Sequence, residues 1–233
     1  MTAHPANEPR KPVEPEPVEP EPVEERLADR LSAHLVPDRD HPIGQRVTNL
    51  LSRLGHYDRA AYRAVAGVWT PLLDEPLRQL SRFANHSKPW FLIAGVLALS
   101  GGPRGRRAAV TGVAAIAVTS FAVNQPMKLA GDRRRPDREQ LGVPRGRWVR
   151  MPLSTSFPSG HSASAAAFAV AVSDVVPQLR LPLRAAAAVV AFSRVYTGVH
   201  YPGDVIVGAA TGALLGRGTS IAASRIRRRV HPS

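Results

Sequence analysis

The sequence predicts an all-α protein, an integral membrane helical bundle of about five to six helices with an amphipathic N-terminal helical region. Two observations predict this fold. Apolar blocks recur from residue 89 onward and are rich in glycine and alanine, which favour close helix contacts in a bilayer. Residues 41–88 instead place leucines at helical spacing among polar and basic residues. The mean hydropathy of -0.14 averages these unlike regions and the polar tail before them.

The first domain is a tail, residues 1–40. It contains the sequence Pro-Val-Glu-Pro-Glu twice in succession, at residues 12–16 and 17–21. Prolines and acids in this density cannot form a core, so we expect an extended, disordered segment. It acts as a solvated spacer or, alternatively, binds a partner.

The second domain, residues 41–88, holds three amphipathic stretches, at 45–54, 60–69 and 72–83. Two interpretations stay open for them. The stretches lie on a bilayer surface with basic side chains toward anionic headgroups, or they pack on the rest of the protein.

The third domain, residues 89–225, carries the apolar blocks, and residues 226–233 form a basic tail. Most blocks are shorter than the ~20 residues that span a bilayer, although Gly, Ser and Pro at their ends extend them. A soluble bundle is the alternative. The blocks are residues 90–100, 108–123, 163–176, 183–195 and 205–223.

The formal net charge of +13 predicts an anionic partner: nucleic acid, a membrane surface or a phosphorylated substrate. Absence of cysteine from the sequence excludes disulfides, thiolate zinc sites and a cysteine nucleophile.

Polar islands at the ends of the apolar blocks carry the chemistry. In an up-and-down bundle, all of them reach the same end. The islands contain Lys128, Arg135 and Pro136; then Pro158, Ser159, Gly160 and His161; and then Ser193, Arg194, His200 and Asp204.

Phosphate binding is the chemistry that the cations predict. Lys128, Arg135 and Arg194 supply a point charge and two planar guanidinium forks. Ser159 and Gly160 precede a helix, where backbone N–H groups can face an anion.

Two histidines complete the predicted site. Asp204 holds one nitrogen of His200 and leaves the other as a nucleophile, while His161 protonates the leaving oxygen. The few acids in this region form no cluster of oxygen ligands, so we expect neither a metal ion nor another cofactor.

These islands resemble the signature of the type 2 phosphatidic acid phosphatase superfamily. The patterns KxxxxxxRP, PSGH and SRxxxxxHxxxD are each matched in full and in order, from Lys128 to Asp204. The resemblance implies a metal-independent phosphatase with a phosphohistidine intermediate. It implies catalysis by His200, His161 and Asp204, and phosphate binding by Lys128, Arg135, Ser159, Gly160 and Arg194.

The resemblance further implies a lipid substrate: polyprenyl diphosphate, phosphatidic acid or phosphatidylglycerophosphate. Residues 60–100 also resemble phosphatase domains fused to a diacylglycerol-kinase-like domain, which favours lipids. Two alternatives are a vanadate-dependent haloperoxidase-like enzyme and a non-catalytic basic protein that binds membranes or nucleic acid. We expect no nucleic-acid partner.

Basic residues also bear on location. Arg133 and Arg134 are interpreted as membrane-flanking anchors. Other arginines gather at the end opposite the site, which by the positive-inside rule predicts a multi-pass cell-membrane protein with an extracytoplasmic site. They are Arg104, Arg106, Arg107, Arg180, Arg184, Arg225, Arg227, Arg228 and Arg229.

Overall fold

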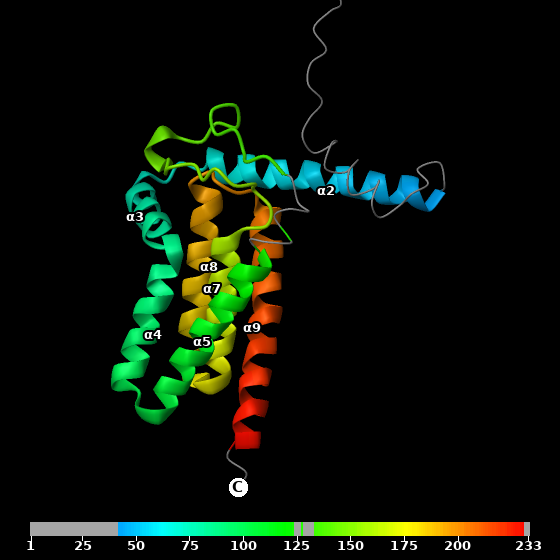
Figure 1. Ribbon diagram of the computed structural model, residues 1–233. Coiled ribbons are helices and arrows are strands. Elements are labelled where there is room, and N and C mark those ends of the chain that lie inside the picture. The colour runs from blue at the N-terminus through cyan, green and yellow to red at the C-terminus, as the bar shows by residue number, and fades with distance from the viewer. Residues whose placement is uncertain (1–41, 124–126, 128–132, 231–233) are drawn as a thin grey trace, which may run out of the picture.

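The structure is a computed structural model that describes residues 42–123, 127 and 133–230, and its regular elements in these ranges are helices (Figure 1). The predicted all-α fold is therefore confirmed. The predicted tail of residues 1–40 and Lys128 lie outside the described residues. The helices are α2 Pro42–Gly67, α3 Pro71–Phe83, α4 Lys88–Ser100, α5 Gly102–Ala122, α7 Gly160–Val175, α8 Arg180–Tyr196 and α9 Pro202–Val230, with 3-10 turns η1 Asn85–Ser87, η3 Arg145–Arg147 and η4 Pro177–Leu179.

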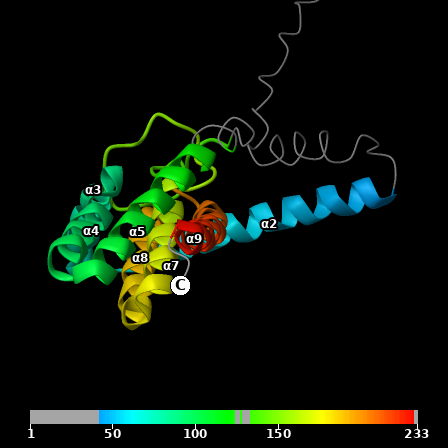
Figure 2. The same ribbon diagram turned by 60° about the horizontal axis from the view of Figure 1, so that its bottom comes forward.

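Helices α4, α5, α7, α8 and α9 run along one common direction and form the bundle (Figures 1 and 2). Each predicted apolar block lies within or almost within one of them, and polar residues at the block ends extend the helix as expected. The predicted basic tail differs in one respect. Helix α9 continues through Val230, so the arginines after residue 224 belong to its last turns.

Close packing of α7 on α9 depends on glycines. Gly208, Gly212 and Gly216 lie four residues apart on one side of α9 and are buried. A Cβ atom at any of them would lie between 2.0 and 2.5 Å from a backbone carbonyl oxygen of α7, closer than any real contact. Only glycine permits this approach, and it brings the start of α9 against Ser159 at the start of α7.

Helix α2 lies across one end of the bundle and projects past it (Figures 1 and 2). It joins the first two predicted amphipathic stretches into one helix. Its second half packs on the bundle, where Tyr62 is buried and its hydroxyl donates to the Gly198 carbonyl oxygen at 3.2 Å. In its first half, Leu50 and Leu54 are about half exposed, at 56% and 53%. Packing on the protein thus accounts for one half of the helix only.

Arg147 fixes α2 and α3 relative to the bundle. Its buried guanidinium donates to the carbonyl oxygens of Val65 and Ala66 at the end of α2, at 3.2 and 3.3 Å. Its Nε lies 2.8 Å from Asp74 Oδ1 in α3. A charged side chain therefore caps the end of α2, a role that the sequence alone did not indicate.

Within the described ranges, α9 is the one helix whose length and hydropathy together suffice for a bilayer span. Helices α7 and α8 are shorter, with 16 and 17 residues.

Candidate active site

A pocket of about 190 Å³ opens at the end of the bundle that α2 crosses. The loop of residues 133–159, the turn between α8 and α9, and the η1 turn meet there. Four predicted site residues line the pocket: Arg135, Gly160, His161 and His200. The remaining lining residues are Ala84, His86, Ser87, Ser120, Pro152, Ser154 and Ser164.

His200 sits at the base of this pocket and is 2% exposed. Its Nδ1 makes a long contact of 3.5 Å with Asp204 Oδ2, and its Nε2 lies 3.2 Å from Arg135 Nη1. Because a guanidinium can only donate, Nε2 accepts and carries the lone pair, which leaves the proton on Nδ1 facing the carboxylate. This tautomer presents Nε2 as the nucleophilic nitrogen.

The pKa of His200 is lowered to about 4, chiefly by burial and also by the positive charges of Arg135 and Arg194, while Asp204 acts in the opposite direction. The imidazole is therefore neutral at pH 7. A neutral ring is the form that a nucleophile needs, because protonation of Nε2 would remove the reactive lone pair.

Asp204 is fully buried at the start of α9 and is held from several sides. Its carboxylate accepts from the Ser156 hydroxyl, from the Tyr201 amide at 2.9 Å and from Arg133 Nη1 at 2.9 Å. These bonds fix the carboxylate that faces His200. Ser156 lies outside the matched motifs, and the sequence carried no signal that could have identified it.

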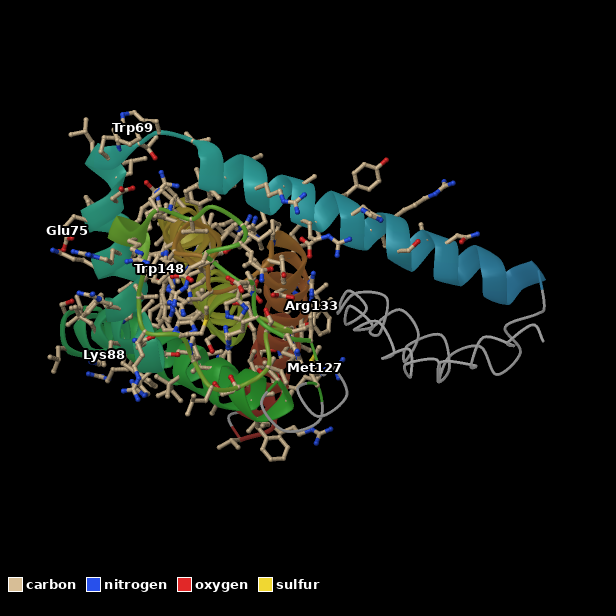
Figure 3. All side chains as sticks on the ribbon, turned by 90° about the horizontal axis from the view of Figure 1, so that it is seen from above. Trp69, Glu75, Lys88, Met127, Arg133 and Trp148 are labelled. Carbon is tan, nitrogen blue, oxygen red and sulfur yellow. The ribbon has the colours of Figure 1, made fainter. Side chains whose placement is uncertain are left out.

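Arg133 is a structural residue of the site, and its interpretation as a membrane-flanking anchor is wrong. It is 6% exposed and lies between α2 and α9 (Figure 3). Its Nη2 is 2.7 Å from Asp58 Oδ2 of α2, while its Nη1 contacts Asp204. The guanidinium also stacks over the ring of Tyr201 at 4.0 Å. This cation pairs with a buried carboxylate of α9 and a partly buried carboxylate of α2. The run of three arginines in the sequence did not reveal that role.

Arg135 crosses the mouth of the pocket. Its Nε donates to the Ser154 carbonyl oxygen at 2.8 Å and its Nη1 to the Val199 carbonyl oxygen at 2.7 Å. Burial lowers the pKa of Arg135 to about 10, and Asp204 acts in the opposite direction. The side chain therefore stays cationic at pH 7 beside His200.

Arg194 lies beneath the pocket and does not line it. It is 1% exposed, and its Nη1 donates to the carbonyl oxygen and hydroxyl of Ser81 in α3, at 2.9 and 2.6 Å. Its buried Nε forms no hydrogen bond with the part of the chain that the structure describes. A buried donor without a partner is costly, so a bound anion would offset that cost. Phosphate binding by Arg194 stays a prediction.

The start of α7 serves both the fold and the pocket. The Ser159 hydroxyl accepts from the Ser162 amide as the helix N-cap, and the Ser159 amide donates to the Asp204 carbonyl oxygen at 2.9 Å. Both polar groups of Ser159 are thus engaged within the protein. Gly160 and His161 face the pocket instead. The predicted role of Ser159 at a phosphate stays a prediction.

His161 has a partner that sequence reasoning missed. Its Nε2 lies 3.0 Å from Oδ1 of Asn85, in the turn between α3 and α4. The same turn supplies His86 and Ser87 to the pocket, and both adopt left-handed backbone angles, with φ of 56° and 58°. Residues other than glycine rarely do so, and such strain gathers at functional sites. This left-handed backbone is invisible in the sequence.

In the described ranges, no group of three or more His, Asp or Glu side chains converges as metal ligands would. Independence from a metal stays a prediction.

The comparisons with known proteins agree on one family. The sequence profile of the PAP2 superfamily matches residues 108–230. The chain is 36% identical over 166 residues to decaprenylphosphoryl-5-phosphoribose phosphatase of Mycobacterium tuberculosis (strain ATCC 25618 / H37Rv), covering 68% of this chain and 88% of that protein. The chain is also 43% identical over 70 residues to lipid A 1-phosphatase of Rhizobium johnstonii, a match that covers 30% of this chain and 29% of that protein.

Solved structures share the fold. The transmembrane PAP2 type phosphatidylglycerolphosphate phosphatase from Bacillus subtilis aligns with a TM-score of 0.55 and 19% identity, covering 90% of this chain and 98% of that one. LpxE from Aquifex aeolicus aligns with a TM-score of 0.53 and 23% identity, covering 69% of this chain and 92% of that one. On the profile match, the relatives and the pocket around His200, the chain belongs to the PAP2 superfamily.

Proposed function

We propose that this chain, a lipid phosphate phosphatase of the PAP2 superfamily, removes a phosphate monoester from a sugar that a polyprenyl phosphate carries. The observation that carries the proposal is the pocket on His200, where a neutral nucleophile, a cation and a second histidine meet. The M. tuberculosis relative, which the chain covers to 88%, is named for such a substrate. Hydroxyl side chains at the pocket, Ser87, Ser120 and Ser154, suit the hydroxyl groups of a sugar.

In the first step, Nε2 of His200 attacks the phosphorus atom and the bond from phosphorus to the leaving oxygen breaks. Asp204 faces the Nδ1 proton and stabilises the positive charge that develops on the ring. Arg135, which lines the pocket, stabilises the negative charge on the phosphoryl oxygens, and the positive charge of Arg194, outside the pocket lining, adds to that stabilisation.

His161 donates a proton to the leaving oxygen, so that a neutral alcohol departs. Asn85 holds the imidazole in place for this transfer. In the second step, His161 accepts a proton from water, which attacks the phosphohistidine. The bond from phosphorus to Nε2 of His200 breaks, its electron pair returns to Nε2, inorganic phosphate forms, and both histidines return to their initial states.

The test is phosphate release by the purified chain in detergent with EDTA, comparing wild type with His200→Ala. The substrates are a polyprenyl phosphosugar phosphate, polyprenyl diphosphate, phosphatidic acid and phosphatidylglycerophosphate. We expect activity with EDTA, highest kcat/KM for the sugar phosphate, and a loss of at least about 10³-fold in the variant.

Two results would contradict the proposal in different ways. Higher kcat/KM for any of the other lipids would overturn the substrate assignment alone. Equal activity of wild type and His200→Ala, or loss of activity on EDTA treatment, would overturn the mechanism.

We also propose a multi-pass arrangement in which the His200 end faces out of the cytoplasm, because exposed arginines gather at the opposite end. The chain has no cysteine, so single cysteines report accessibility directly. In intact cells, a membrane-impermeant maleimide is expected to label Leu153→Cys, beside the pocket, and to leave Arg228→Cys at the end of α9 unlabelled. The reverse pattern would invert the orientation.

A further inference from the structure

A second pocket, of about 670 Å³, opens at the end of the bundle away from His200. The first turns of α5, the end of α7 and the last turns of α9 surround it. These helix ends lie together at the bottom of Figure 1, whereas the loop that carries Arg135 lies at the top. The proposed phosphatase reaction uses none of the residues that line this second pocket.

The charge of the second pocket is strongly positive. Its lining contains four arginines and one acid, Asp174, which is 2.7 Å from Arg217 and therefore already neutralised. Within the described residues, none of the four lining arginines forms an ion pair. Arg104 donates its Nε to the Val175 carbonyl oxygen at 2.8 Å, which leaves the rest of its guanidinium available. The four are Arg104, Arg106, Arg107 and Arg227.

The distance of this pocket from the active site follows from α9, which reaches both ends of the bundle. Asp204, beside the nucleophile, and Arg227, in the second pocket, are 23 residues apart in this one helix. At ~1.5 Å per residue this separation is about 35 Å, slightly more than the ~30 Å hydrocarbon layer of a bilayer. Exposed Leu214 and Ile221 lie on the helix between the two ends. The two pockets therefore lie at the two headgroup levels of one membrane.

The geometry points to a binding site for the phosphate-bearing headgroup of an anionic phospholipid, in the leaflet opposite the active site. Guanidinium forks from two helices can grip phosphate oxygens together. The volume falls within the range of small-molecule sites, and it admits a glycerophosphate headgroup. Val110, which is 70% exposed beside the arginines, offers an apolar surface to an acyl chain.

A soluble anion is the alternative source of the same phosphate chemistry. The apolar wall at Val110 and the position at headgroup depth favour the lipid, because a free anion would gain from the arginines alone. Among the described residues that line this pocket there is no histidine, so the reaction proposed at His200 has no counterpart in that lining. A lipid that bridges α5 and α9 would stabilise the folded bundle by linkage.

The test is the thermal unfolding midpoint of the full chain in a neutral detergent. It is measured with added dioleoylphosphatidylglycerol, with dioleoylphosphatidylcholine, and with glycerol phosphate at the same concentration. We expect phosphatidylglycerol to raise Tm by roughly 5 °C. The other two additives are expected to have little effect.

Variants then locate the effect. Arg106→Gln with Arg107→Gln removes two charges from the pocket, whereas Arg180→Gln with Arg184→Gln removes two exposed charges from α8, outside the pocket lining. The Tm increase is expected to disappear in the first double variant and to persist in the second. If the Tm increase is lost equally in both double variants, the lipid is attracted by general surface charge, and the proposed site is overturned. An equal increase with glycerol phosphate would overturn the lipid assignment. Phosphatase activity in lipid-free detergent, assayed in parallel, tests the catalytic proposal separately.

Discussion

The two ends of the bundle are both rich in arginine, but the arginines are held differently. At the His200 end, Arg133 is 6% exposed and is bound to two carboxylates, the buried Asp204 and the partly buried Asp58. At the other end, Arg106 and Arg107 are exposed and, within the described residues, form no ion pair. The arginine at the His200 end therefore holds the structure together through ion pairs, whereas the arginines at the other end are exposed to solvent or membrane.

This difference indicates that the buried charge of Arg133 positions neighbouring side chains and does not attract an anion. A buried cation must have a partner at defined geometry, because desolvation costs several kcal/mol for an unpaired ion. The ion pairs of Arg133 with Asp58 and Asp204 meet that requirement, and they orient the Asp204 carboxylate that faces His200. An exposed arginine carries no such constraint, and it remains available to an anion from solution or membrane.

The largest expected effect comes from Arg133→Met, which removes the buried cation and keeps an unbranched apolar side chain. Asp204 would then be buried, and Asp58 partly buried, without their shared cation, and an uncompensated buried charge typically destabilises a protein by about 3–5 kcal/mol. We expect a large loss of Tm and of phosphatase activity. Arg106→Met is the matched control from the other end and is expected to unfold like wild type. Similar Tm values for both variants would contradict the distinction between the two ends.

The sequence predicts the bundle and the residues that line the pocket, but it does not predict which distant side chains support them. Apolar blocks and motif order brought Arg135, Gly160, His161 and His200 to one pocket, because these signals are local and periodic. The partners Asp58, Asn85 and Ser156 come from segments that only tertiary packing brings to the site. Their residue types are ordinary at such positions, so no local pattern marks them. The run of Arg133 to Arg135 looks like an ordinary basic cluster in the sequence, although Arg133 is buried and Arg135 is partly buried in the structure.

The second prediction concerns Asn85, which we expect to be a positioning residue for His161. In Asn85→Ala the imidazole loses its hydrogen bond of 3.0 Å and kcat falls by roughly 10- to 100-fold for an alkyl phosphate. With p-nitrophenyl phosphate the loss is expected to be much smaller, because that leaving group departs without a proton. Kinetics on both substrates provide the measurement, and Asn49→Ala, at an exposed asparagine of α2 outside the pocket lining, serves as the control. An equal loss on both substrates would show that Asn85 serves folding or binding instead.

The third prediction is the acid limb of the pH profile. Because the pKa of His200 is lowered to about 4, chiefly by burial, kcat/KM is expected to fall only as the pH approaches 4. Stability follows the same sign. The unfolded ring takes up a proton near pH 6.5, so the contribution of neutral His200 to folding declines between pH 6.5 and 4. Arg135→Gln removes one neighbouring charge and should move the limb upward, at reduced activity. An acid limb near pH 6.5 in the wild-type enzyme would contradict the claim that burial lowers the pKa of His200.

The smallest expected effect is at the open end. Arg106→Gln with Arg107→Gln removes two exposed side chains that form no ion pair within the described chain, so stability in lipid-free detergent should change by less than about 0.5 kcal/mol. Activity in that detergent should match wild type, since the two arginines of α5 share their pocket with Arg227, which lies about 35 Å along α9 from Asp204 at ~1.5 Å per residue. Urea unfolding and phosphate release measure both quantities. A loss of activity without any loss of stability would mean that this end of the bundle is coupled to His200 through α9, so that the two ends act together.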